Sequence, residues 1–303
     1  MLQIREFAVS IPYGKSKKRY FLSCAAADEY VVGWMKRGWP FEPFNLYVLS
    51  KILRARSVIF DVGAHIGTYS VILGKLCPQS SIYAFEPQVP LYSILLNNLS
   101  KNRVENCTPF NLAIAHRETI SAMQRAVSDG TGTGKTVSYN TREKYNFGGL
   151  SVGMGEHVVA CISLDSFVNK ARLNQIDLLK IDVEGAEPFV FFGAREILKK
   201  HRPIIHFEAN GKRITTELAR GLGSTTRSQA AGFSIQKLLG GKNYLYVRMP
   251  FDNIMLVPQE RMPREILTLF DLFQSDSPFF RKMYVFKWDK YSTGYRPDGI
   301  QLN

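Results

Sequence analysis

The 303-residue chain has no paired cysteines and no long apolar run. Its four cysteines are widely separated: Cys24, Cys77, Cys107 and Cys161. The absence of a C-x-x-C pair argues against a zinc site and favours free thiols in a reducing compartment. No apolar stretch approaches the roughly 18–20 residues that a membrane-spanning helix needs, and Arg5 and Glu6 interrupt any apolar signal-peptide core. We therefore predict a cytoplasmic protein with no transmembrane segment and no metal site.

Acidic residues are also in the minority, with 26 against 39 basic residues and a formal charge of +13. Such a surplus favours anionic partners such as nucleic acid, acidic membrane surfaces, or phosphorylated or carboxylated substrates. No RNA-binding signature accompanies the basic clusters, which lie at residues 15–19, 51–56, 199–202 and 281–290. A basic surface that serves only solubility is the alternative, so charge alone selects no partner.

The most informative stretch is VIFDVGAHIGTYS, residues 58–70. An apolar run that ends in Asp61 and is followed by Gly63 and Gly67 is typical of a buried parallel strand, a tight turn and a helix N-terminus. The spacing differs from the dinucleotide pattern G-x-G-x-x-G. D-x-G-x-x-x-G suits a ligand that presents an amino acid end and a sulfonium rather than a pyrophosphate. A nucleotide-binding or ligand-free crossover is the alternative that this motif leaves open.

A helix over residues 68–76 and a strand over residues 81–85 follow, and the strand ends at Glu86. An acidic residue at the end of the second strand of a βαβ unit can accept both hydroxyl hydrogens of a ribose. Asp61, Gly63, Gly67 and Glu86 together therefore predict a site for a ligand that contains a nucleoside.

The next part of the chain predicts a helix over residues 91–100, a third strand over residues 108–115 and an irregular stretch over residues 119–155. The stretch SDGTGTGKT, residues 128–136, resembles a phosphate-binding loop. However, Asp129 stands where that pattern needs glycine, and no strand precedes it. We interpret this stretch as a surface loop.

Carboxylates recur at the predicted strand ends of the second half. A strand over residues 176–182 ends in Asp182, and one over residues 203–207 ends at Glu208. The carboxyl ends of parallel strands meet at one edge of an open sheet, so we expect Asp61, Asp182 and Glu208 to converge there, with Glu184 just beyond. Glu187 precedes Pro188 and is interpreted as part of a helix start, for a helix over residues 189–200.

Shorter signals complete the prediction. Residues 7–11 and 20–23 are predicted as short strands, and Asp28 as the N-cap of a helix through Met35. The aromatic segment WPFEPF, residues 39–44, precedes a helix over residues 45–53 and either covers the ligand crevice as a lid or packs on the sheet. Later strands are predicted at 233–238, 244–247, 254–257 and 282–288, the middle two antiparallel, with a helix at 263–273.

The motifs DVGAHIGTYS, FEP, SLDSF, IDLLKIDVEGAE, PIIHFE and NIMLVP occur in this order between about residues 40 and 258. In this order and spacing the chain resembles the FkbM-type methyltransferase family. The resemblance implies an α/β fold: a Rossmann-like, seven-stranded, mostly parallel sheet with an antiparallel last strand and helices on both faces. We predict a domain at 51–260, an N-terminal extension or lid at 1–50 and a C-terminal extension at 261–303.

The resemblance also implies S-adenosylmethionine as the methyl donor. The residues that would bind it are Asp61, Gly63, Ala64, His65, Gly67, Glu86 and Asp182. Many relatives carry a small amide in place of His65, which leaves the role of this residue open. The residues from which a catalytic base would come are Asp182, Glu184, Glu208 and His206. A core histidine without a catalytic role is the alternative for His206.

Relatives mostly methylate hydroxyls, so the sequence predicts O-methylation of a sugar, glycan or other small molecule, including an anionic one. Because the donor is already activated, the protein mainly aligns the reactants, and a base is useful because a hydroxyl has a high pKa. An RNA ribose 2′-O-methyltransferase is one alternative; such enzymes use a lysine among carboxylates. Lys180 points to the side of Asp182 but two residues deeper, which fits that role poorly. A non-catalytic protein that binds S-adenosylmethionine is the other alternative. The sequence names neither the acceptor nor the oligomeric state.

Overall fold

The structure, a computed structural model, describes residues 2–13, 16–123, 157–184, 186–208, 244–249 and 253–261. The loop predicted at 128–136 and the elements predicted at 233–238, 263–273 and 282–288 lie outside the described residues. None of the described helices is long and apolar enough to cross a membrane.

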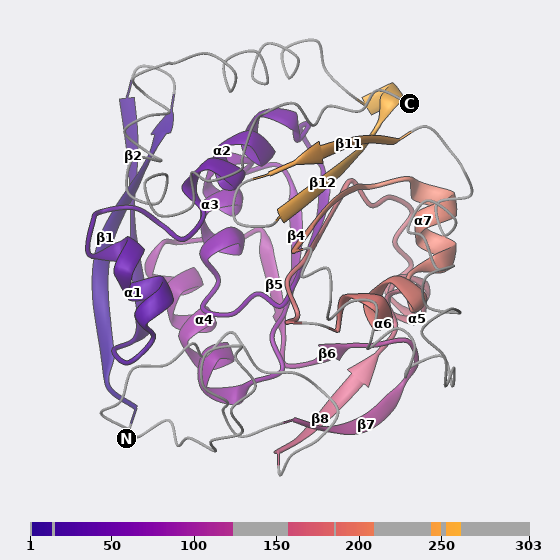
Figure 1. The fold of residues 1–303 in the computed structure, drawn as a ribbon, viewed down its shortest axis with the longest axis horizontal. Coiled ribbons are helices and arrows are strands. Elements are labelled where there is room, and N and C mark those ends of the chain that lie inside the picture. Colours follow the sequence, from indigo (N-terminus) through magenta and orange to yellow (C-terminus); the bar gives the residue numbers. More distant parts are fainter. Residues whose placement is uncertain are drawn as a thin grey trace, which may run out of the picture.

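A seven-stranded sheet forms the centre of the described part (Figure 1). Its strands are β3 (Val58–Val62), β4 (Ser81–Phe85), β5 (Cys107–Phe110), β9 (Leu178–Ile181), β10 (Ile204–Glu208), β11 (Tyr244–Arg248) and β12 (Asn253–Pro258). The spatial order is β11-β12-β10-β9-β3-β4-β5. The strands from β10 to β5 pair in parallel, whereas β12 is antiparallel to both β10 and β11. The predicted fold class is confirmed.

The chain changes direction across the sheet between β3 and β9. From β3 it proceeds outward through β4 to β5, and it then returns to place β9 and β10 on the other side of β3. In open α/β sheets such a switch point opens a crevice at the carboxyl ends of the strands, where ligands bind. The loops after β3 and β9 therefore define the position of a site.

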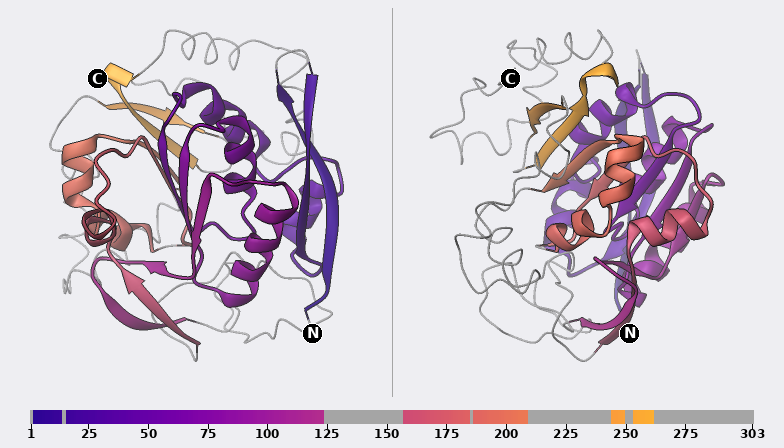
Figure 2. Two further views of the ribbon diagram at one scale, coloured as in Figure 1. Left: turned by 180° about the vertical axis from the view of Figure 1, so that it is seen from behind. Right: turned by 90° about the vertical axis from the view of Figure 1, so that its right-hand side faces the viewer.

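Helices cover both faces of the sheet (Figures 1 and 2). One face carries α2 (Pro43–Ile52), α3 (Thr68–Leu76) and α4 (Val89–Lys101), which pack with strand residues such as Ile59 and Leu178. The other carries α5 (Leu164–Lys170), α6 (Glu187–Phe192) and α7 (Arg195–His201), which pack with Phe60 and Leu179. Successive strand residues alternate between two buried faces, which explains the nearly continuous apolar runs in these strands.

The N-terminal strands are longer than predicted, since β1 (Ile4–Tyr13) and β2 (Ser16–Ala25) pair over ten residues each. Two asparagines of α4 bond to the backbone of β2. The Asn98 side chain accepts a hydrogen bond from the N–H of Ser23 and donates to its carbonyl, and Asn102 does the same for Phe21. These amides satisfy backbone groups along an edge that would otherwise be open to pairing with another chain. The helix after Asp28 is α1 (Glu29–Met35), capped as predicted.

The predicted third strand over residues 108–115 is wrong, because it consists of β5 and the separate β6 (Ala113–Ile114). Between them the Asn111 amide donates to the carbonyls of Glu86 and Pro87, where the chain leaves the central sheet. β6 pairs with β8 (His157–Ile162) in a small sheet whose third strand, β7 (Thr119–Met123), falls in the stretch predicted as irregular.

The single helix predicted over residues 189–200 is two helices, α6 and α7, separated at Gly193. A Cβ at Gly193 would lie 2.1 Å from the carbonyl oxygen of Ala115 and 2.9 Å from Ser163 Cβ. Its own carbonyl accepts a hydrogen bond from the N–H of Asp165, outside the helix ladder. The break is therefore a consequence of close packing against distant segments, which the helical periodicity could not reveal.

Candidate functional site

The glycine loop after β3 lies against the turn after β9. Gly63 has a φ of +76°, and a Cβ built there would lie 1.8 Å from the carbonyl oxygen of Asp182. The N–H groups of Gly63 and Ala64 both donate to the carbonyl of Phe85 at the end of β4. Only glycine combines this backbone angle with this close approach. The loop thus joins the ends of the three central strands.

Lys180 lies between two of the predicted carboxylates. Its Nζ lies 3.2 Å from Asp61 Oδ1 and 3.5 Å from Asp182 Oδ2, and it donates to the carbonyl of Gly63 at 3.0 Å. Asp61 also accepts a hydrogen bond from Ser70 Oγ at 2.6 Å. Although burial opposes the charged amine, the charges of Asp61 and Asp182 raise the pKa of Lys180. Lys180 lies two residues before Asp182 in the chain, but its long side chain brings the amine up to the loop and to both carboxylates.

Glu86 is buried at the end of β4 and its carboxylate is fixed by backbone groups. Oε2 accepts from the N–H of His65 at 2.8 Å, and Oε1 from the N–H of Gln88 at 2.9 Å. Burial raises the pKa of Glu86 despite these bonds and the nearby charge of His65. Each oxygen retains a second lone pair with which it can accept a ligand hydroxyl.

His65 connects the glycine loop to the N-terminal segment. Its Nε2 lies 3.2 Å from Oδ2 of Asp28, the fully buried N-cap residue of α1. Burial alone would lower the pKa of His65, but the carboxylate of Asp28 beside the ring outweighs it, so the pKa is raised. His65, whose role the sequence left open, thus joins the glycine loop to the start of α1.

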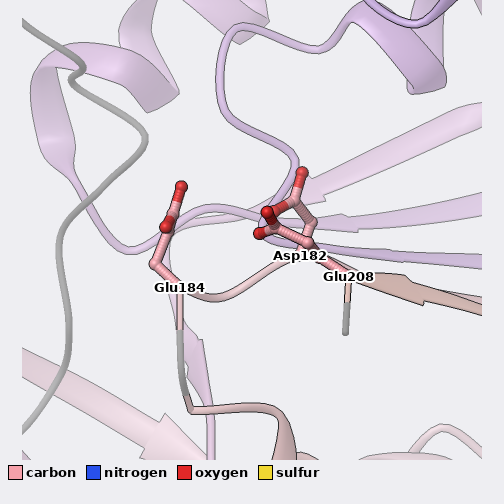
Figure 3. Close-up of side chains that lie close together, drawn as sticks. All are labelled: Asp182, Glu184 and Glu208. Atoms are coloured by element: carbon pink, nitrogen blue, oxygen red, sulfur yellow. The ribbon is translucent and has the colours of Figure 1, made fainter. Parts of the chain in front are cut away.

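Asp182, Glu184 and Glu208 converge at the carboxyl ends of β9 and β10 (Figure 3). One oxygen from each lies within 4.8 Å of the others. Burial, followed by the negative charges of Asp182 and Glu184, raises the pKa of Glu208 to about 9. Glu208 therefore holds a proton at neutral pH. Glu184 has a φ of +52°, a strained conformation of the kind that is concentrated at functional sites.

This trio is the group of acidic side chains in the described ranges that could hold a metal ion. Its oxygen ligands suit Mg²⁺ or Ca²⁺ rather than a softer metal. Lys180 already offsets one of the charges, and an acidic cluster by itself identifies no ligand.

Glu42, which no sequence signal singled out, lies behind this trio. Its Oε2 accepts a hydrogen bond from the hydroxyl of Tyr69 and its Oε1 from the amide of Asn253, both at 2.6 Å. Glu187 is also buried nearby, and its Oε1 accepts from the N–H of Val183 at 3.2 Å, which supports its interpretation as part of a helix start.

His206 is separated from the trio. It is 1% exposed, lies beside Lys180 in the strand register, and its ring is 5.9 Å from that of Tyr69. Burial and the charge of Lys180 lower the pKa of His206 to about 3, so the ring is neutral. In the described part of the chain neither ring nitrogen has a hydrogen-bond partner. A neutral, enclosed imidazole is poorly placed to contact an acceptor.

The predicted residues thus fall into two groups. Asp61, Gly63, Ala64, His65, Gly67, Glu86 and Asp182 surround the loop at the switch point, and Asp182 also joins Glu184 and Glu208. Sequence reasoning missed Glu42 and the contact of Asp28 with His65. The single available signal for Glu42 was a charged residue within an aromatic segment.

A cavity of about 380 Å³ lies at the amino-terminal ends of β3, β9 and β10, opposite the carboxylates. It brings together parts of two basic clusters, and its basic lining residues are Arg54, Lys200 and Arg261. These three cations lie near the C-terminal ends of α2 and α7, where positive charge offsets the helix dipoles. That structural role accounts for them without a ligand.

The chain is similar in sequence to known methyltransferases. The model of the methyltransferase FkbM domain matches residues 61–233, more than half of the chain. Methyltransferase 1 of Beauveria bassiana is 27% identical over 148 residues, which are 45% of this chain and 58% of that protein. The 2-O-methyltransferase NoeI of Sinorhizobium fredii is 27% identical over 160 residues, 51% of this chain and 64% of that protein.

Two further matches cover a smaller share of the matched protein. The AMB antimetabolite synthetase AmbE of Pseudomonas aeruginosa is 26% identical over 209 residues, 61% of this chain and 10% of that protein. A crystal structure of methyltransferase FkbM from Methylobacillus flagellatus KT has a TM-score of 0.42 and 17% identity, covering 70% of this chain and 46% of that one. The chain spans less than two thirds of the length of the three curated relatives.

Proposed function

The chain belongs to the FkbM methyltransferase family, and we propose that it transfers a methyl group from S-adenosylmethionine to a hydroxyl of a sugar, glycan or other small molecule. The observation that carries this proposal is the convergence of Asp61, Glu86 and Asp182 around the glycine loop at the switch point. The relative NoeI, a 2-O-methyltransferase by name, supports the hydroxyl acceptor.

The donor set fits S-adenosylmethionine chemically. Carboxylates accept hydrogen bonds from ribose hydroxyls and from an ammonium group, and they favour a nearby sulfonium. Glu86 would bind the ribose, while Asp61, Asp182 and the loop from Gly63 to Gly67 would hold the methionine end. When bound, S-adenosylmethionine supplies a methyl group that is already activated for displacement.

The protein's own contribution to the chemistry is alignment and proton removal. Glu208 is the base that we favour, with Asp182 and Glu184 beside it. Because its pKa is about 9 without ligand, Glu208 needs a positive charge nearby to release its proton at neutral pH. A bound sulfonium would supply that charge, so donor binding would activate the base.

The same charges constrain the acceptor. Asp182, Glu184 and Glu208 surround the place where the methyl group would be transferred, and like charges there would repel an anion. We therefore propose that the acceptor is uncharged near its reacting hydroxyl, and that any anionic group on it lies farther away. Carboxylates are also good acceptors for the several hydroxyls of a saccharide.

Calorimetric titration with S-adenosylmethionine tests the donor site. Wild-type protein should bind in the micromolar range, and Asp61→Asn and Glu86→Gln should each weaken binding at least tenfold, about 1.4 kcal/mol. Glu105→Gln, which removes an exposed carboxylate ahead of β5, is the matched control and should bind normally. A folded wild-type protein that binds no S-adenosylmethionine would refute the proposal. A screen of neutral and acidic glycans would then identify the acceptor.

RNA is a second candidate acceptor, because Lys180 lies between two carboxylates as a 2′-O-methyltransferase would require. Against it, the Lys180 side chain is only 5% exposed and its amine bonds to the glycine loop. Methyl transfer to short RNAs, with binding that falls steeply as salt rises, would favour this candidate over a saccharide.

A further inference from the structure

Glu42 lies outside the matched region 61–233, yet its side chain is buried at the edge of the proposed site. Its backbone is left-handed, with φ 49° and ψ 53°, which residues other than glycine adopt at a cost. As the N-cap residue of α2 it could bond to the first helical turn, but its side chain makes no such bond. A residue that is strained and does not cap its own helix points to a role for the side chain elsewhere.

Both partners of the Glu42 carboxyl group belong to the surroundings of the site. Asn253, which donates to Oε1, lies opposite Glu208 in the pairing of β12 with β10. Tyr69, which donates to Oε2, has its ring 5.0 Å from the amine of Lys180. Glu42 is therefore held close enough to the carboxylates at the ends of β9 and β10 to interact electrostatically with Asp182 and Glu208.

We propose that Glu42 is a positioning and specificity residue of the methyl-transfer site: its buried negative charge favours the cationic methyl donor over the neutral demethylated product. This inference rests on the proposed function. S-adenosylmethionine and S-adenosylhomocysteine differ by one methyl group and one positive charge, so they share every other contact. A carboxylate enclosed by protein acts on that difference more strongly than an exposed one, because water screens it less.

The protonation of Glu42 provides a control within the wild-type protein. Burial and the charge of Asp182 raise its pKa, Tyr69, Lys180 and Asn45 act in the opposite direction, and the net result is a pKa of about 7. The groups that face Glu42 come from five elements: Asn45 on α2, Tyr69 on α3, Lys180 and Asp182 at β9, Glu208 on β10 and Asn253 on β12. Between pH 5.5 and 8.5 Glu42 loses its proton in the ligand-free protein. Donor binding would also lower the pKa of Glu208 from about 9, but that effect is common to wild type and Glu42→Gln, so comparing the two proteins isolates Glu42.

The experiment compares the dissociation constants of both ligands for wild type and Glu42→Gln. The amide is nearly isosteric, and its oxygen can accept from Asn253 while its NH2 donates to the hydroxyl oxygen of Tyr69, so the variant should keep its thermal midpoint. At pH 8.5 it should bind S-adenosylmethionine about three- to tenfold more weakly and S-adenosylhomocysteine unchanged. At pH 5.5, where Glu42 is neutral in the wild type, the two proteins should bind both ligands alike. Glu105→Gln should leave the dissociation constants of both ligands unchanged at both pH values.

Glu42→Asp provides the converse test, since it retains the charge but loses the hydrogen-bond geometry. It should preserve the ratio of the two affinities even if both fall. If Glu42→Gln weakens both ligands equally, or neither, the inference is wrong although the donor site stands. A wild-type protein that binds no S-adenosylmethionine refutes the proposed function instead. If Glu42→Gln does not fold, Tyr69→Phe takes its place. Loss of the Tyr69 hydrogen bond raises the pKa of Glu42, so the ratio of the two dissociation constants must change at a higher pH than in wild type. If that pH does not move, the inference is wrong.

Discussion

Replacing Gly63 by alanine should separate the cost of backbone strain from the cost of crowding two loops. The added Cβ would lie 1.8 Å from the carbonyl oxygen of Asp182, whereas ordinary contact begins at 3.4 Å, so the loops would have to part by about 1.6 Å. A left-handed φ costs alanine about 1–2 kcal/mol, and overpacking adds about 1–3 kcal/mol. We expect a loss of about 2–5 kcal/mol in the free energy of unfolding.

Gly38 offers a matched control, because its φ of +77° is nearly the same and a Cβ there would meet nothing within 4 Å. Gly38→Ala should therefore lose only the strain of about 1–2 kcal/mol. Urea denaturation followed by circular dichroism measures the free energy of unfolding of both variants. Calorimetry measures donor binding, which Gly63→Ala should abolish and Gly38→Ala should not. Equal losses in the two variants, within about 0.5 kcal/mol, would refute the close approach of the loops.

Other predictions concern charge and hydrogen bonding. Lys180→Met should destabilise the protein by about 3–5 kcal/mol in urea unfolding, because Asp61 and Asp182 lose their buried counter-charge. The pKa of Glu208 is raised on folding from 4.5 to about 9, so the folded state holds its proton more tightly and stability should fall as pH rises through this window. The loss is up to about 1.4 kcal/mol per pH unit, and Glu208→Gln should flatten the profile. Asn98→Ala should cost about 2–3 kcal/mol and weaken donor binding, since Asn98 bonds to both β2 and the Ile66 carbonyl of the glycine loop. Dialysis against a chelator should leave methyl transfer unchanged, because Lys180 and the proton on Glu208 already offset charge in the trio.

Each of these has an outcome that contradicts it. A Lys180→Met protein of wild-type stability would mean that the pair of Lys180 with Asp61 is not buried as described. A pH profile of stability that Glu208→Gln does not alter would assign the dependence to another group. Normal donor binding by a destabilised Asn98→Ala variant would show that the β1–β2 hairpin has no influence on the donor site. Loss of activity on chelation, restored by Mg²⁺, would make the carboxylate trio a metal site.

Local sequence was sufficient for the elements that position the site. The bounds of α3 and β4 agree with the prediction residue by residue, since apolar runs, glycines and a crossover of ordinary length leave few alternatives. The convergence of Asp61, Asp182 and Glu208 followed from one rule, that parallel strands present their carboxyl ends at one edge. The predicted roles of these residues, and the division into extensions and a central domain, stay predictions.

Tertiary structure decided what depends on contacts between distant segments. Glu42 meets Asn253 across 211 residues, and Lys180 meets Gly63 across 117. The break at Gly193 arises from packing against Ala115. The sequence by itself determined which residue types stand at the strand ends, because hydrophobic periodicity and turn chemistry act over a few residues. Side-chain length, burial and the packing of α2 and α3 on the sheet then determined which charges meet, and no local pattern encodes those distances.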